Sequence, residues 1–175
     1  MADIKEKFEF DVAEGFFEWL TDNGGPRCVF SGRAGQAPDL VYVAATGEEI
    51  QIEITGTYYD GSHAKFLWDD LRGVTNPSSG WHGVGNPDKK LANDLSKRLH
   101  EKCKKRYGPT TILLIQIPPG LTSAEDLAKL LFAQTLPPVV SFAGVYVVGR
   151  FPITSKSSGG YRVLTIKEYW PLPSA

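Results

Sequence analysis

The most constraining feature of the sequence is a stripe of leucines that leads into a nearly continuous apolar run. Leu91, Leu95 and Leu99 recur every four residues within 88–107, which predicts a helix with one narrow apolar face. The run at 110–117 reads TTILLIQI, which is typical of a strand covered on both faces. A helix that feeds such a strand is typical of a crossover connection. We therefore expect an α/β fold with a mixed central sheet and flanking helices.

The rest of the sequence divides into short periodic segments separated by glycine and proline. We expect helices at 8–20, within 60–73 and at 123–134, and strands at 27–31, 39–45, 49–59, 145–151 and 161–169. This order describes an antiparallel meander that continues into a parallel or mixed sheet. At 175 residues, the chain is predicted to form a single domain.

Composition excludes several classes of protein. Hydrophobic residues make up 42% of the chain and charged residues 22%, which favours an ordered domain over a disordered one. Cys28 and Cys103 form neither a zinc motif nor a CxxC motif, and we expect both to be reduced thiols. The chain starts with charged residues and contains no apolar run of the length that a membrane helix needs. We expect a cytoplasmic protein without a membrane partner.

Two acidic residues on neighbouring predicted strands form the clearest candidate site. Ile50, Ile52 and Ile54 alternate with Gln51, Glu53 and Thr55, so the polar side chains share one face of the strand. A turn at 46–48 places Asp39 opposite residues 53–55. Two carboxylates in this arrangement can share Mg²⁺ or Mn²⁺, which take oxygen ligands.

At this point the chain resembles the PD-(D/E)XK nuclease superfamily, whose signature is Pro-Asp on one strand and Glu-x-Lys on the next. The matching residues are Pro38-Asp39 and Glu53-Ile54-Thr55, and the order of helix, three strands, helix and strand matches the family's core over 8–117. Residues 118–175 are a C-terminal extension outside that match. The resemblance implies a restriction-endonuclease-like fold and a magnesium-dependent endonuclease.

The resemblance also implies roles for individual residues. Asp39 and Glu53 would bind the metal beside the backbone carbonyl of Ile54, and Gln51 would contact a phosphate or orient a water. A carboxylate of the first helix, either Glu14 or Glu18, would complete the metal site, and we favour Glu14. These roles are expectations from the resemblance.

The sequence departs from the family at Thr55, which stands where the family has lysine. A threonine hydroxyl carries no charge with which to polarise the attacking water or neutralise a developing phosphate charge. A lysine from another element would have to take its place. The candidates are Lys65, Lys89 and Lys90.

Basic residues are concentrated in the segment 88–107. Lys89, Lys90, Lys97, Arg98 and Lys104 could follow a phosphate backbone, while the alternative is an ordinary solvated helix face. The loop residues Trp81 and His82 could stack on a base and transfer a proton, or they could serve only to anchor the loop.

These features predict a metal-dependent nuclease that hydrolyses phosphodiester bonds of nucleic acid. One alternative keeps the fold without the activity, as an inactive nuclease-like module that binds nucleic acid or a protein partner, including a second copy in a homodimer. A third is an interaction protein in which the two acids meet by chance.

Overall fold

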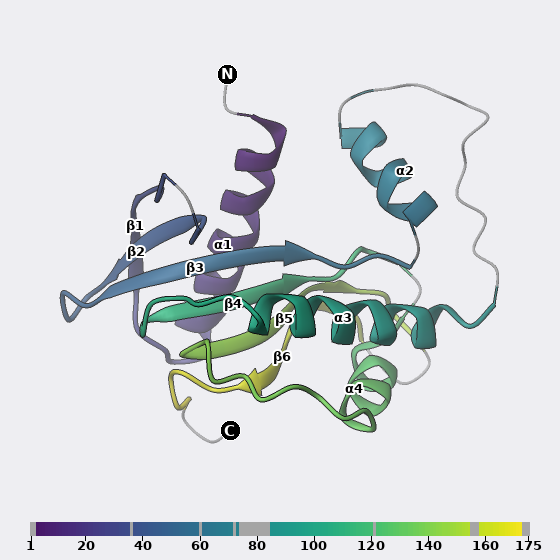
Figure 1. Ribbon diagram of the computed structural model, residues 1–175. Coiled ribbons are helices and arrows are strands. Elements are labelled where there is room, and N and C mark those ends of the chain that lie inside the picture. The colour runs from purple at the N-terminus through teal and green to yellow at the C-terminus, as the bar shows by residue number, and fades with distance from the viewer. Residues whose placement is uncertain are drawn as a thin grey trace.

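The computed structural model describes residues 3–35, 37–59, 61–71, 73, 85–120, 122–154 and 158–172. They build an open mixed sheet with helices on both of its faces (Figure 1). The elements are α1 (Ile4–Asp22), β1 (Cys28–Gly32), β2 (Leu40–Ala44), β3 (Glu49–Gly56), α2 (Gly61–Leu71), α3 (Pro87–Cys103), β4 (Thr111–Gln116), α4 (Ala124–Phe132), β5 (Gly144–Phe151) and β6 (Gly160–Lys167).

The six strands lie in the sheet in the order in which they occur in the chain. β1, β2 and β3 form an antiparallel meander, β3, β4 and β5 are parallel, and β6 returns antiparallel to β5. The connections between parallel strands contain α2 and α3 in one case and α4 in the other. The predicted α/β class, with a meander that continues into a mixed sheet, is therefore confirmed.

The helices cover the sheet in two layers, each with its own apolar core. α1 packs against Ile50, Ile52 and Ile54 of β3 and the matching residues of β4 and β5. α3 and α4 pack on the opposite face, over Leu113 and Ile115 of β4. Residues 111–115 have no exposed surface, which confirms the prediction of a strand covered on both faces.

α3 forms because its start and its buried face are both encoded locally. The Asn86 side chain accepts a hydrogen bond from the Lys89 backbone N–H at 3.0 Å, and Pro87 occupies the first turn. The leucines of the predicted stripe are fully buried. The helix ends at Cys103 rather than continuing to residue 107, because the Lys105 N–H bonds to the Lys102 carbonyl and tightens the last turn.

The C-terminal third of the chain is an integral part of this architecture. Residues 118–172 supply α4, β5 and β6, and β5 is buried between β4 and β6. These residues therefore complete both cores. None of the described helices combines the length and the apolar character needed to cross a membrane.

Candidate functional site

Asp39 and Glu53 lie opposite each other where β2 begins beside β3. The register pairs Leu40 with Ile52, so the next pair outward is Asp39 with Glu53. The Asp39 N–H donates to the Ile52 carbonyl at 3.0 Å, and the Ile54 N–H donates to Asp39 Oδ2 at 2.8 Å. The structure thus brings together the two acids that the sequence pattern singled out, on the sheet face toward α3.

The Glu53 carboxylate is buried, and only one of its two oxygens has a hydrogen-bond partner among the described residues. Its side chain alternates with the isoleucines that face α1, and the residue is 4% exposed. Oε1 accepts from Lys102 Nζ at 2.5 Å and from Tyr107 Oη at 3.2 Å. Oε2 is buried and has no hydrogen-bond partner among the described residues. A buried acceptor without a partner is unfavourable, so this oxygen is the clearest position for a ligand at the site.

Asp39 experiences the negative charge of its neighbour. Burial raises the pKa of the Asp39 carboxyl to about 6, the Ile54 N–H opposes this change, and repulsion from Glu53 and Glu9 adds to it. Burial and the charges of Glu53 and Asp39 also raise the pKa of Tyr107, so its hydroxyl stays protonated as a donor. Burial is thus the main cause of both pKa shifts, and the neighbouring negative charges add to it.

Lys102 is the first contact of the candidate site that sequence reasoning missed. It lies one residue before the end of α3, with its side chain 18% exposed and its ammonium on Glu53. The candidates considered for the missing lysine were elsewhere. Lys65 and Lys89 are exposed and Lys90 is half-buried. Lys102 follows Leu99 by three residues and so flanks the buried stripe, which is the signal that could have identified it.

Glu9 of α1 is the second missed residue. It is 5% exposed and lies between Lys5 and Arg33, with an ion pair of 2.9 Å to each. Its charge contributes to the raised pKa of Asp39, so α1 does present a carboxylate toward the pair.

The two first-helix acids that were predicted lie elsewhere. Glu14 is exposed and accepts a hydrogen bond of 2.7 Å from the Tyr42 hydroxyl, whose ring belongs to the core under α1. Glu18 lines a separate groove. Within the described ranges, no three His, Cys, Asp or Glu residues are grouped closely enough to hold a metal. The carboxylate contribution to any cation site here is the Asp39–Glu53 pair.

Gln51 and Thr55 flank Glu53 on the same face of β3. Gln51 Oε1 accepts from Thr111 Oγ1 of β4 at 3.0 Å, so that oxygen already has a structural partner. Thr55 is half-buried next to Ile115 of β4 and places no charge at the site.

The basic residues predicted to bind nucleic acid differ in their availability. Lys89, Lys97 and Lys104 are exposed along α3 and its end. Arg98 is engaged within the helix, 3.6 Å from Asp94 and 3.8 Å from Glu101. Trp81 and His82 lie outside the described residues. Cys28 and Cys103 are free thiols, as the sequence led us to expect.

Comparisons with known proteins do not add to this geometry. The chain matches no protein-family model, no curated protein and no solved structure.

The raised pKa of Asp39 predicts a pH-dependent effect of Asp39→Asn on stability in the presence of a chelator. The folded-state pKa of about 6 lies above the unfolded value of roughly 3.9, so the folded state holds this proton more tightly. Stability associated with Asp39 is therefore present at low pH and lost as the pH rises through 6. We expect Asp39→Asn to raise the melting temperature at pH 7.5, with a gain that shrinks to nothing between pH 6 and pH 4. A constant gain over that range would contradict the assignment.

Proposed function

We propose that this protein hydrolyses phosphodiester bonds of nucleic acid with the help of a divalent cation bound at Asp39 and Glu53. The observation that carries the proposal is the unpartnered Glu53 Oε2, buried beside a second carboxylate whose pKa is raised. The order of α1, the β1–β3 meander, α3 and β4 is also the order of a restriction-endonuclease-like core.

The residues at this position fit Mg²⁺ or Mn²⁺. Asp39 and Glu53 would hold the ion beside the Ile54 carbonyl, and phosphate or water oxygens would complete the ligand set. When bound, such an ion polarises a phosphoryl oxygen and lowers the pKa of a coordinated water. Its charge would also compensate the repulsion that raises the pKa of Asp39. A cation between the two carboxylates would therefore be electrostatically favourable.

Lys102 supplies the positive charge that Thr55 lacks. Its ammonium reaches Glu53 from α3 and remains partly accessible. At this place it would stabilise negative charge that develops on a phosphate, the task that the motif lysine performs in the family. Tyr107 would keep the Glu53 carboxylate in position through its hydrogen bond to Oε1.

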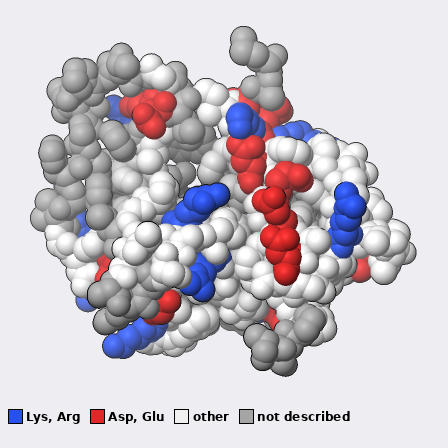
Figure 2. Space-filling model, turned by 180° about the vertical axis from the view of Figure 1, so that it is seen from behind, with Lys and Arg blue, Asp and Glu red and all other residues white. Residues whose placement is uncertain are grey.

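The charge distribution of the helices favours approach of a polyanion from the α3 side. Lys97 and Lys104 are exposed on this side of the sheet, the same side as Glu53 and Lys102. The opposite side, which carries α1, displays a column of acidic side chains (Figure 2). Phosphates would therefore meet the basic side and the acidic pair together.

A second candidate function is binding of nucleic acid without cleavage. The observation that favours it is the ion pair of 2.5 Å between Lys102 and Glu53, because the ammonium already occupies one of the carboxylate oxygens that a metal would use. In this case Lys102 is the cation of the site, and the module recognises its target through the basic residues of α3 alone.

Incubation of the wild-type protein with a set of nucleic acids tests the proposal. Supercoiled plasmid, linear duplex DNA, single-stranded DNA and RNA are each incubated with Mg²⁺, Mn²⁺ or a chelator, and products are resolved on gels. We expect cleavage of at least one substrate with a divalent ion and none with the chelator. Absence of cleavage from every substrate, with no rise in melting temperature on adding either ion, would overturn the nuclease proposal.

The same substrates distinguish the second function. Binding of uncut nucleic acid that weakens with increasing salt, and that is lost when Lys97 and Lys104 are both changed to glutamine, would support the inactive module. Binding unaffected by those two changes would contradict both functions as stated.

A further inference from the structure

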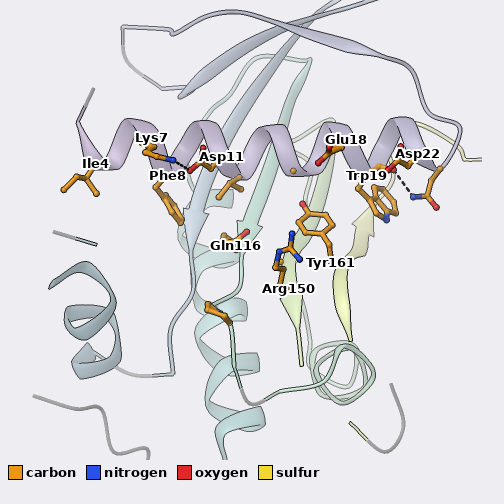
Figure 3. Close-up of a pocket in the computed structure, with 15 residues that line it drawn as sticks. Ile4, Lys7, Phe8, Asp11, Glu18, Trp19, Asp22, Gln116, Arg150 and Tyr161 are labelled. Carbon is orange, nitrogen blue, oxygen red and sulfur yellow. Dashed lines mark hydrogen bonds and ion pairs between the residues drawn. The ribbon is translucent and has the colours of Figure 1, made fainter. Parts of the chain in front are cut away.

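The groove lined by Glu18 is a cavity on the opposite side of the sheet from the acidic pair. It has a volume of about 760 Å³ and lies between α1 and the ends of β4, β5 and β6. Figure 3 shows α1 along one side of it, with Gln116, Arg150 and Tyr161 on the strands facing the helix. The volume is within the range of small-molecule sites, and the carboxyl ends of parallel strands are a common place for them.

The sheet face under α1 changes from apolar to polar side chains where it meets this cavity. Along β4, Ile112 and Leu114 are buried under α1, and the next residue on that face is Gln116. Along β5, Tyr146 and Val148 are followed by Arg150. The apolar core therefore ends in polar side chains that line the cavity, which is a pattern that packing alone does not require.

Three charged side chains in the cavity wall, Arg150, Glu18 and Asp22, have no hydrogen-bond or ion-pair partner in the described part of the chain. Arg150 is exposed and forms no hydrogen bond or ion pair there, and the same holds for Glu18 of α1. Arg150 is the direct cross-strand partner of Tyr161. Burial raises the pKa of the Tyr161 hydroxyl, the charge of Arg150 opposes this change and that of Glu18 adds to it, so both charges lie near this ring. They form no ion pair with each other, and both line the cavity.

The other side chains that line the cavity limit the chemical class of ligand that it can bind. Asp11, which also lines the cavity, is neutralised by Lys7 at 2.5 Å. Phe8, Val12 and Trp19 of α1 provide apolar and aromatic surface. The Tyr161 ring lies beside Gly15 of α1, where an added Cβ would lie 3.4 Å from Tyr161 Cε2, at van der Waals distance.

We propose that this cavity binds a small zwitterion with an apolar or aromatic body, such as a free amino acid or a short peptide. Arg150 binds the carboxylate of the ligand, Glu18 binds its ammonium group, and the aromatic walls hold its side chain. The opposite charges on the two walls match a molecule that carries both charges better than one that carries either alone.

This site is independent of the proposed nuclease function. The acidic pair lies on the face toward α3, whereas the cavity lies on the face toward α1. An experiment on the cavity needs neither nucleic acid nor metal, so failure of one proposal does not affect the other.

Four probes with one aromatic body separate the contributions of charge. L-phenylalanine carries both charges, phenylacetate only the negative, phenethylamine only the positive, and 2-phenylethanol neither. Glycyl-phenylalanine tests the peptide source. Titration is followed by calorimetry and by amide NMR shifts. We expect phenylalanine or the dipeptide to bind with a Kd below about 1 mM and each singly charged probe at least tenfold more weakly, about 1.4 kcal/mol for each lost charge pair.

Variants assign those charges to their residues. Arg150→Gln is expected to reduce the affinity for phenylalanine to the affinity that the wild type has for phenethylamine. Glu18→Gln is expected to reduce it to the wild-type affinity for phenylacetate. Arg162→Gln, next to Tyr161 on β6, removes the same charge from a side chain that does not line the cavity and is expected to leave the affinity unchanged. The proposal is wrong if neither zwitterion binds below about 5 mM, if phenylacetate binds as tightly as phenylalanine, or if Arg162→Gln weakens binding as much as Arg150→Gln.

Discussion

Glu53→Gln is expected to lower the rate of metal-dependent cleavage by about 10³-fold while the protein stays folded. The change removes one of the two carboxylates that would hold the cation, and a bound cation contributes several kcal/mol of transition-state stabilisation. A loss of about 4 kcal/mol corresponds to this factor. Because glutamine has nearly the shape of glutamate, and its amide oxygen can still accept from the Tyr107 hydroxyl, the fold is expected to persist. Initial rates with Mn²⁺ on the best substrate measure the effect.

Glu49→Gln is the matched control for this variant. Glu49 is exposed at the start of the same strand. It lies opposite Val43 of β2, away from the acidic pair. Its replacement removes the same charge from β3 and is expected to leave the rate within about twofold, since surface charges at this distance are screened. Equal losses in the two variants would indicate a general charge effect and would refute the assignment of Glu53.

Lys102→Met is expected to destabilise the protein by about 2–4 kcal/mol, in the lower part of the range for removing one partner of a buried ion pair. Methionine retains the apolar length of the side chain but leaves the Glu53 carboxylate buried without its cation. The value is reduced because Lys102 is partly accessible, so water can partly replace it. Denaturant unfolding at pH 7.5 with a chelator measures the change, and Mn²⁺ is expected to restore part of the loss.

The double variant Glu53→Gln with Lys102→Met separates stability from catalysis. It contains no unpaired buried charge, so we expect most of the lost stability to return while cleavage stays at the level of Glu53→Gln. Lys105→Met removes an exposed lysine just beyond the same helix and is expected to change stability by less than about 0.5 kcal/mol. A double variant no more stable than Lys102→Met would show that the two side chains do not act as a pair.

The fold could be predicted from the sequence because its signals are local. The alternation along β3, the run in β4 and the leucine stripe of α3 each depend on neighbouring residues in the chain, and the structure has every predicted helix and strand. The differences are at the ends of elements. β3, for example, ends at Gly56 because the Tyr58 N–H turns away to bond with Asp94 of α3 at 2.9 Å.

The site could be predicted only as far as the β2–β3 turn fixes it. One short turn joins the strands beside which Asp39 and Glu53 lie, so the alignment of the two residues follows from counting residues along both strands. Lys102 is separated from Glu53 by 49 positions, and their contact depends on where α3 lies across the sheet. Glu9 could have been found, because it extends the buried spacing of Val12, Ala13 and Phe16 by one turn, whereas Glu14 and Glu18 fall outside that spacing.

The cavity under α1 could not be predicted because its polar groups converge only in space. Gln116, Arg150 and Tyr161 come from three strands and form no motif in the sequence. They become neighbours through the register that aligns β4, β5 and β6.

The placement of α1 and α3 on opposite faces of one sheet also separates opposite charges in space. α1 contains six acidic and two basic residues, whereas the stretch 88–107 contains eight basic and three acidic ones. These two elements therefore contribute a dipole component across the thickness of the sheet. In the field of any highly charged surface the protein experiences a torque before contact, and its rotational orientation is biased during diffusion. This bias shortens the orientational search of an encounter and fades as ionic strength rises.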